Sequence, residues 1–244
     1  MGFLRGLAKG LAGVIFLLLL FGLLINITLY ESTKYDSLKP ILTTMLSKTL
    51  ENQNMTPIYN NAQEKCGTQS SYNLLIGDSN VTLECSKIKS SNQQEFAKSI
   101  AETLFDQQLY NRQCNGIDCL KLQDIPGFAT RSFNEFLKIA LFVLAGAVVL
   151  FGIFLFLLSK GLQSKLSSLG TPFILVGISA IPLEFFKQKM QMGDFQIFFD
   201  KLTMVISKYM LASLAIGIIL VAAGIAIAIK NRKKKKSKKK GRKK

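Results

Sequence analysis

The sequence contains no histidine and no tryptophan. Without histidine, a Ser-His-Asp triad, a Cys-His pair and a histidine-based metal motif are excluded. The sequence also lacks a C-x-x-C pair, a P-loop and a GxGxxG motif, so it has no signature of redox catalysis or nucleotide binding. Carboxylates such as Asp118 and Asp124 remain, but soluble domains generally contain such pairs. We therefore expect no enzyme activity, no metal site and no cofactor.

Charged residues are absent from four long stretches, 10–30, 139–159, 166–183 and 209–229. The hydrocarbon core of a bilayer requires about 20 helical residues, so 166–183 is marginal and the other three are long enough. We predict an α-helical membrane protein with four transmembrane helices. In the alternative, three helices span the membrane and 166–183 is a re-entrant segment.

The first of these stretches is also a candidate signal sequence. Arg5 and Lys9 precede it, as basic residues do in a secretory signal peptide. Its apolar run is longer than the roughly 7–15 residues of a signal peptide, and no small-x-small cleavage site follows. We therefore expect a retained signal anchor.

Acidic residues are absent from three segments, 1–9, 160–165 and 230–244. Because Lys and Arg favour the cytoplasmic side of a membrane, we assign all three to the cytoplasm, as N-terminus, loop and tail. The protein is then a multi-pass protein of the cell membrane, with residues 31–138 and 184–208 outside. A three-span topology would export the basic tail.

The tail is the most basic part of the chain. Like charges repel and nothing apolar can be buried, so we expect it to be unstructured in water. Its cations would bind anionic lipid head groups or ribosomal RNA through electrostatics alone. These cations are Lys230, Arg232, Lys233, Lys234, Lys235, Lys236, Lys238, Lys239, Lys240, Arg242, Lys243 and Lys244.

Residues 31–138 are numerous enough to form a small domain with its own core. The segment "SLKPILTTMLSKTL" has apolar residues at helical spacing, with Pro40 in the first turn. The segment "NLLIGDSNVTLEC" predicts a β-hairpin. "SSNQQEFAKSIAETLFDQQLY" predicts a second helix capped by Ser91 with Gln94, and Ser132 repeats that pattern with Glu135 before the second span. The domain is therefore α+β and mostly helical.

The segment between the third and fourth spans, "GDFQIFFDKLTMVISKYM", keeps the helical period of its apolar residues. No breaker separates it from the fourth span, which predicts one helix from about residue 195 to 230. We expect its apolar stripe to pack on the external domain, and the outer leaflet is the alternative.

The four cysteines, Cys66, Cys85, Cys114 and Cys119, all lie within residues 31–138. An even number on the oxidising side of a membrane predicts two disulfides. Three pairings are possible, of which Cys66–Cys85 with Cys114–Cys119 is the most local. A metal site is the rival interpretation, but the spacing fits zinc poorly.

Three N-glycosylation sequons occur. Asn80 lies in the predicted turn of the hairpin and is the best acceptor. Asn26 falls in or beside the first span, and the sequon of Asn54 ends directly before a proline. A chance occurrence of all three in an Asn-rich chain is the alternative.

Glu184 is the ionisable candidate near the membrane interior, at the outer end of the third span. Pro172 and Pro182 would break that helix and shape a pore or gate. A simple interfacial position of Glu184 is the alternative.

The fourth span carries small residues on one helical face, as close packing between membrane helices requires. This seam would pack within the bundle or in a dimer. Its residues are Ser213, Gly217, Gly224 and Ala228.

The stretch "NVTLECSKI…EFAKSIAETLFDQQLYNRQCNGIDCLKL" resembles the external domains of uncharacterised membrane proteins from archaeal genomes. In those domains a Cys after a short strand precedes a helix that ends in Tyr and a close Cys pair. The likeness covers about residues 75–140 and extends to the four-span arrangement. It implies an archaeal cell membrane, and it supplies no activity and no site residues.

Three functions compete on these observations. The first is a non-catalytic membrane protein whose external domain binds a protein partner or senses, while the tail holds an anionic surface. The second is an oligomeric channel or transporter subunit whose proline-broken third helix lines a pore. The third is a membrane enzyme that uses carboxylates alone. We prefer the first, because it accounts for the disulfides, the packing seam and the missing catalytic chemistry.

Overall fold

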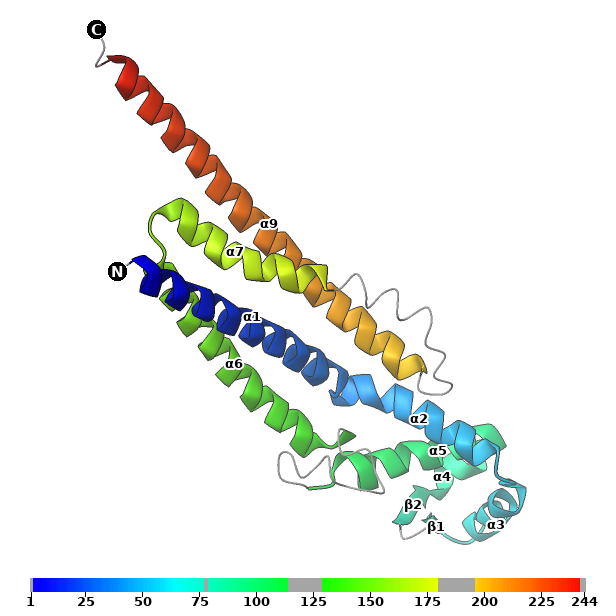
Figure 1. The fold of residues 1–244 in the computed structure, drawn as a ribbon. Coiled ribbons are helices and arrows are strands. Elements are labelled where there is room, and N and C mark those ends of the chain that lie inside the picture. The colour runs from blue at the N-terminus through cyan, green and yellow to red at the C-terminus, as the bar shows by residue number, and fades with distance from the viewer. Residues whose placement is uncertain (1, 77–78, 114–128, 180–195, 242–244) are drawn as a thin grey trace. The chain divides into compact units, whose positions relative to one another are not determined.

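The computed structural model describes residues 2–76, 79–113, 129–179 and 196–241. They form two compact units (Figure 1). The first, called the bundle here, contains the described residues of Met1–Leu29, Ile139–Met192 and Phe199–Lys244. The second, called the disulfide domain, contains those of Tyr30–Lys138 and Gly193–Phe198.

In the described part of the chain, the bundle is formed by helices. These are α1 (Gly2–Ser32), α6 (Arg131–Leu158), α7 (Leu162–Ile178) and α9 (Gln196–Gly241). The stretches Gly6–Ser32, Arg131–Leu158 and Phe199–Asn231 are long and apolar enough to cross a membrane. The protein is thus mostly helical, with three candidate membrane spans among its described residues, a coarser result than the predicted four.

The predicted fourth span, 166–183, is not shown by the structure. Its helix α7 begins earlier, at Leu162, and ends at Ile178 after 17 residues. At 1.5 Å per residue such a helix is about 26 Å long, shorter than a hydrocarbon core of about 30 Å. Residues 180–183 of the predicted span lie outside the described residues.

The bundle packs around one face of α1, where apolar side chains recur every fourth residue. The buried cluster contains Ala12, Phe16, Leu20 and Leu24 of α1, Leu155 of α6, Val176 of α7 and Met210 of α9. The opposite faces are apolar and exposed, as at Leu18 (65%), Leu157 (66%) and Ile219 (67%). Exposed apolar surface of this extent is typical of helices solvated by lipid.

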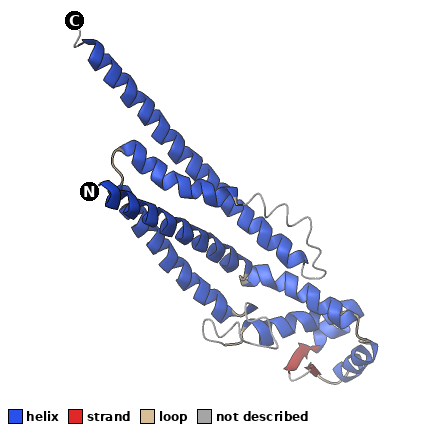
Figure 2. Cartoon of the chain, in the orientation of Figure 1, coloured by secondary structure: helices blue, strands red, loops and turns tan. Residues whose placement is uncertain are grey.

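The disulfide domain is built from α2 (Tyr35–Glu51), α3 (Thr56–Cys66), β1 (Ser71–Ile76), β2 (Ser79–Glu84), α4 (Cys85–Lys89), α5 (Gln93–Leu104) and the π-helix η1 (Phe105–Tyr110). Figure 2 shows the strands of the described residues, which form the β1–β2 hairpin. The hairpin is antiparallel, with Ser71 opposite Glu84 and Ile76 opposite Ser79. This confirms the hairpin and the α+β, mostly helical character of the domain. Helix α3 was not predicted.

The domain has a core of its own on the inner faces of α5, α4 and the hairpin. Phe96, Ile100, Ile88 and Val81 are fully buried in it, together with the disulfide cysteines. A second cluster joins α2 to η1 through Leu38, Leu42 and Phe105. Burying a large apolar side chain stabilises a fold by about 1.5–3 kcal/mol, so these clusters hold the domain together.

Helix α2 is confirmed, but it begins earlier than the sequence indicated. Pro40 was expected in the first turn and lies inside the helix instead. The first turn closes on Lys34, whose carbonyl accepts from the Leu38 backbone N–H at 2.9 Å. Tyr35 explains the early start, because its ring packs against Phe105 and Tyr110 with centroids 5.8 and 4.9 Å away.

Both predicted helix caps are shifted. The capping box of α5 uses Asn92 instead of Ser91: its Oδ1 accepts from the Glu95 N–H at 2.9 Å, and its own N–H donates to Glu95 Oε2 at 3.0 Å. A carboxylate is the stronger acceptor, so this pair displaces the Gln94 alternative. At the start of α6, Thr130 Oγ1 accepts from the Phe133 N–H at 3.2 Å, the capping role expected for Ser132.

Helix α9 confirms the single long helix predicted from about residue 195, since it begins at Gln196. It continues to Gly241, so the expectation of an unstructured tail is wrong for the described residues. Lys and Arg are good helix formers, and cations are favoured near a helix C-terminus. The segment with the apolar stripe divides between the two units: residues 196–198 belong to the disulfide domain, as expected, whereas Ile206 and Tyr209 pack against the bundle cluster.

Candidate functional site

The predicted small-residue seam of the fourth span packs against α7 within the bundle. A Cβ added to Gly217 would lie 2.7 Å from the Ile174 backbone N and 2.8 Å from the Gly170 carbonyl O. Ser213 Oγ donates to the Phe173 carbonyl O at 3.0 Å, and Gly224 lies against Gln163. The seam therefore joins two helices of the same chain, one of the two uses considered above.

The candidates for a pore or gate are brought together only in part. Pro172 is buried within α7, where it lines a cavity of the bundle. Pro182 and Glu184 lie outside the described residues. The described residues therefore give no geometry for a gate.

The disulfide between Cys66 and Cys85 joins the last residue of α3 to the first residue of α4, with the two Cα atoms 5.1 Å apart. This bond is one of the two disulfides in the most local of the three possible pairings. The other pair, Cys114 and Cys119, lies outside the described residues. Both bonded cysteines are buried in the core, so the crosslink fixes the start of α4 from inside the domain.

The connection between α4 and α5 is held from three sides. Tyr59 of α3 donates through its hydroxyl to the Ser91 carbonyl O at 2.6 Å, and its ring lies 5.3 Å from that of Phe96. Ser91 Oγ donates to the Ile88 carbonyl O at 3.0 Å and so closes α4. The Asn92 capping box fixes the first turn of α5. This corner of the domain is therefore a rigid element.

A polar groove of about 390 Å³ runs over this corner. Its charged lining consists of Lys87 on α4 and of Glu95, Lys98 and Glu102 on α5. The α5 residues are spaced three and four apart, so they share one helical face. Three serine hydroxyls complete the lining, at Ser90, Ser91 and Ser99.

Two of the four charged side chains in this groove already have partners within the domain. Lys87 lies 3.5 Å from Glu84 in an exposed ion pair, and Glu95 is engaged in the capping box. Lys98 and Glu102 form no ion pair with any described residue, and Lys98 is exposed. A rigid groove with both signs of charge and several hydroxyls is suited to a polar, mixed-charge surface.

A separate charged cluster ties α2 to η1. Lys39 Nζ donates to Asp106 Oδ2 at 2.8 Å and to the Tyr35 hydroxyl at 2.6 Å, and Tyr35 donates to Asp106 Oδ1 at 2.8 Å. The hydrogen bond to Asp106, followed by that to Tyr35, raises the pKa of Lys39 above that of an ordinary lysine. Burial raises the pKa of the neighbouring Tyr110. All members are engaged with one another, so the cluster is a structural tie.

The remaining predicted residues differ in their exposure. Asn80 is exposed, but it is the second residue of β2, opposite Leu75, and does not lie in the turn as predicted. Asn26 is buried in α1, and its Oδ1 has no hydrogen-bond partner among the described residues. Ala228 is partly buried and Lys230 is exposed, both on α9.

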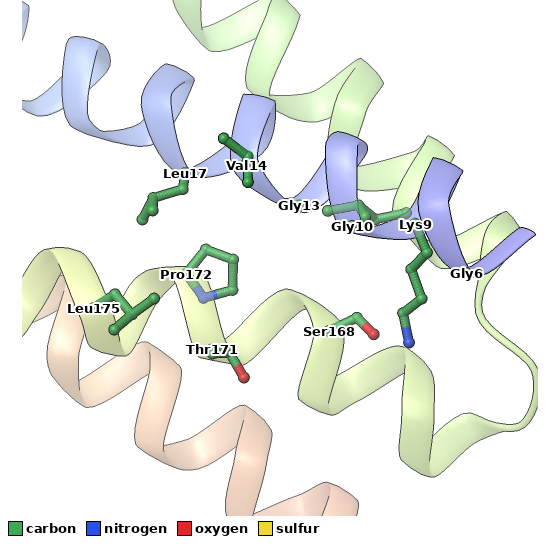
Figure 3. A pocket seen from close by; sticks show the side chains of 11 residues that line it. Gly6, Lys9, Gly10, Gly13, Val14, Leu17, Ser168, Thr171, Pro172 and Leu175 are labelled. Atoms are coloured by element: carbon green, nitrogen blue, oxygen red, sulfur yellow. The ribbon is translucent and has the colours of Figure 1, made fainter. Parts of the chain in front are cut away.

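The bundle also holds a cavity of about 420 Å³ between α1 and α7 that the sequence did not indicate (Figure 3). Lys9 and Ser168 lie at one end of it, and Leu17 and Leu175 lie at the other. Lys9 Nζ donates to Ser164 Oγ at 3.0 Å. The available signal was the glycine spacing of "GLAKGLAG" beside a lysine, but the second wall comes from α7, more than 150 residues later.

A scan against protein-family models and searches of the curated proteins and of the solved structures found no match to this chain. The resemblance to archaeal membrane proteins therefore stays a prediction. Within the described residues, no group of three or more His, Cys, Asp or Glu side chains is placed to hold a metal ion.

Proposed function

We propose that this chain is a non-catalytic integral membrane protein whose residues 31–138 bind a protein partner outside the cell membrane. The α4–α5 groove is the contact surface in this proposal. The observation that carries it is the groove's construction: a disulfide, a capping box and the Tyr59 hydrogen bond fix a surface whose Lys98 and Glu102 have no ion-pair partner among the described residues. Preorganised polar groups lose little entropy on binding, which favours recognition.

The orientation in the membrane belongs to the same proposal. The Cys66–Cys85 disulfide supports an oxidising compartment for residues 31–138, since disulfides persist there. The basic N-terminus, the 160–165 loop and the tail would then face the cytoplasm, with α7 as part of a fourth span over 166–183. This even number of spans places both termini inside.

The tail has a second role in this proposal. As a continuation of α9 it would place its cations at the inner membrane surface, where each Lys or Arg contributes about 1 kcal/mol of attraction to anionic lipid. Ribosomal RNA is the competing anionic surface, because a Lys cluster binds any phosphate polymer.

The test is photo-crosslinking in native membranes, with a crosslinkable residue in place of Lys98. Lys48 provides the matched control, because it is an exposed lysine of the same domain on α2, outside the groove. Mass spectrometry after mild-detergent purification identifies what is attached.

We expect a stoichiometric protein partner from position 98 and none from position 48. A homo-oligomer with no other protein attached contradicts the proposal and favours the channel interpretation, for which ion flux in liposomes is the next measurement.

A further inference from the structure

The α1–α7 cavity is open where the other helix contacts of the bundle are closed. A Cβ added to Gly6, Gly10 or Gly13 on its α1 wall would meet no atom within 4 Å. By contrast, a Cβ on Gly170 of α7 would lie 2.9 Å from the Gly217 carbonyl O. The glycines of α1 therefore do not serve close packing inside the chain. They leave a recess that faces outward from the bundle.

The two ends of this recess differ in chemistry. At one end, Val14 and Leu17 of α1 face Pro172 and Leu175 of α7, so the walls are apolar (Figure 3). At the other end lies the Lys9 ammonium. Residues Lys9 and Leu17 are eight positions apart on one helix, which separates the ends by about 12 Å.

The Lys9 ammonium has a hydroxyl partner and forms no ion pair with a described residue. It donates to Ser164 Oγ at 3.0 Å. The sequence contains no Asp or Glu in residues 1–30 or 136–183, which supply α7, most of α6 and all of α1 except its last two residues. In α9, Asp200 lies 24 positions before Gly224, the glycine that packs against Gln163, so Asp200 is about 36 Å along the helix from this end. Lys160 and Lys165 lie within four residues of Ser164 in the sequence and add further positive charge to this part of the chain. An ammonium at the edge of a membrane is stabilised by an anion, so the countercharge has to come from another molecule.

The hydroxyl groups along the recess already donate hydrogen bonds within α7, so they do not indicate a ligand. Ser168 Oγ donates to the Ser164 carbonyl O, and Thr171 Oγ1 donates to the Ser167 carbonyl O at 2.8 Å. The evidence for an anionic group in the ligand is therefore Lys9, and the evidence for an alkyl chain is the apolar walls.

We infer that the recess binds one membrane lipid with an anionic head group. The phosphate lies at Lys9, and one acyl chain lies between α1 and α7. A volume of about 420 Å³ is within the range of small-molecule sites, roughly 300–1,000 Å³. The inference rests on the membrane placement proposed above and not on the protein partner of the disulfide domain.

A helix of a second copy is the competing occupant, since Gly6 and Gly10 have the spacing of a small-xxx-small contact. The charge argues against it. A parallel second α1 would bring another Lys9 and no nearby carboxylate, because Glu31, the acidic residue of α1, lies 22 positions away and is paired with Lys34. Covering Lys9 in this way would bury a cation without a counterion, which is costly.

The test uses the full chain in a mild non-ionic detergent and counts bound lipids by native mass spectrometry. Phosphatidylglycerol and phosphatidylcholine with the same acyl chains are titrated in parallel, and water-soluble glycerol phosphate is a third arm. The variants are Lys9→Gln, which removes the cation, and Gly13→Leu, which fills the recess where a Cβ meets open space. Lys208→Gln is the control, because it removes an exposed lysine of α9 that does not belong to the basic tail.

We expect phosphatidylglycerol to bind more tightly than phosphatidylcholine and to raise the melting temperature, as a ligand of the folded state does. Lys9→Gln should weaken phosphatidylglycerol binding about fivefold, equal to about 1 kcal/mol for one cation near a lipid head group. Gly13→Leu should abolish the tight site, and Lys208→Gln should leave it intact. Glycerol phosphate should not raise the melting temperature, because it has no acyl chain.

Equal binding by the wild type and Lys9→Gln overturns the inference, and so does equal binding of the two lipids. A crosslinked dimer that Gly13→Leu abolishes, with unchanged lipid counts, assigns the recess to a second copy. None of these outcomes affects the partner test at position 98, so the two proposals fail separately.

Discussion

Gly170 and Gly217 contact each other reciprocally across the α7–α9 interface. A Cβ on Gly170 would lie 2.9 Å from the Gly217 carbonyl O, and a Cβ on Gly217 would lie 2.8 Å from the Gly170 carbonyl O. Real Cβ atoms do not approach backbone oxygen so closely, so each position requires glycine at this helix separation. The contact holds the short α7 against the long α9 and gives α7 a fixed place in the bundle.

Leucine at this interface should separate the two helices. Gly217→Leu, or Gly177→Leu, whose Cβ would lie 2.7 Å from Leu214 Cα, should destabilise the bundle by about 1–3 kcal/mol through overpacking. Thermal unfolding in detergent measures the loss. Gly146→Leu is the matched control, because a Cβ on this α6 glycine meets nothing within 4 Å. Equal melting temperatures for Gly217→Leu and Gly146→Leu would refute the close contact.

Removing the disulfide should loosen the disulfide domain and leave the bundle folded. The bond closes a loop of 19 residues in sequence separation, so the paired variant Cys66→Ala/Cys85→Ala should lose about 3 kcal/mol of stability. Tyrosine fluorescence reports on this domain, because five of the six tyrosines lie between Tyr30 and Tyr110. The far-ultraviolet signal of the bundle helices serves as the internal control. Unchanged tyrosine unfolding in the variant would contradict a structural role for the bond.

The tie between α2 and η1 should weaken at alkaline pH. The folded-state pKa values of Lys39 and Tyr110 are both raised, so their stabilising contribution is complete below the ordinary values of 10.5 and 10.0. It is lost as the pH rises through the folded-state values. Lys39→Met should therefore cost about 1 kcal/mol near neutral pH, as for a partly exposed ion pair, and progressively less in strong alkali.

Urea unfolding of the wild type and Lys39→Met, followed by tyrosine fluorescence across the alkaline range, checks this expectation. Lys48→Met is the control, since Lys48 is exposed on the same helix. A difference between the wild type and Lys39→Met that stays constant up to strong alkali would show that Lys39 acts through packing alone.

Shortening α9 tests the anionic-surface role of the tail. Deletion of residues 231–244 removes eleven of its twelve cations and leaves the span Phe199–Asn231 almost complete. Binding to anionic vesicles in low salt should fall by at least 100-fold, because each cation near the surface contributes about 1 kcal/mol. Co-sedimentation with anionic and neutral vesicles measures it, and ribosomal RNA replaces the vesicles in a parallel arm. Unchanged binding to anionic vesicles defeats the lipid role.

The sequence predicted those features that depend on local composition. Charge-free runs identify the three candidate spans because the solvation cost of a charge is set residue by residue. The hairpin was readable from two apolar runs around a turn. The long α9 was readable because no breaker interrupts its periodicity, although the helix extends further into the tail than charge repulsion suggested. Caps were predicted within one or two residues, since competing side chains with similar spacing occur at each helix start.

Only the tertiary structure decided which apolar or small face meets which neighbour. The glycine seam of α9 could equally have served a dimer, and its pairing with Gly170 depends on the position of α7 in the bundle. Lys39 and Asp106 are 67 residues apart, and Lys9 and Ser164 are 155 apart. A helical period states which side of a helix is apolar and carries no information about the segment that covers it. For this reason the groove over α4 and α5 and the recess between α1 and α7 appear only once the chain is folded.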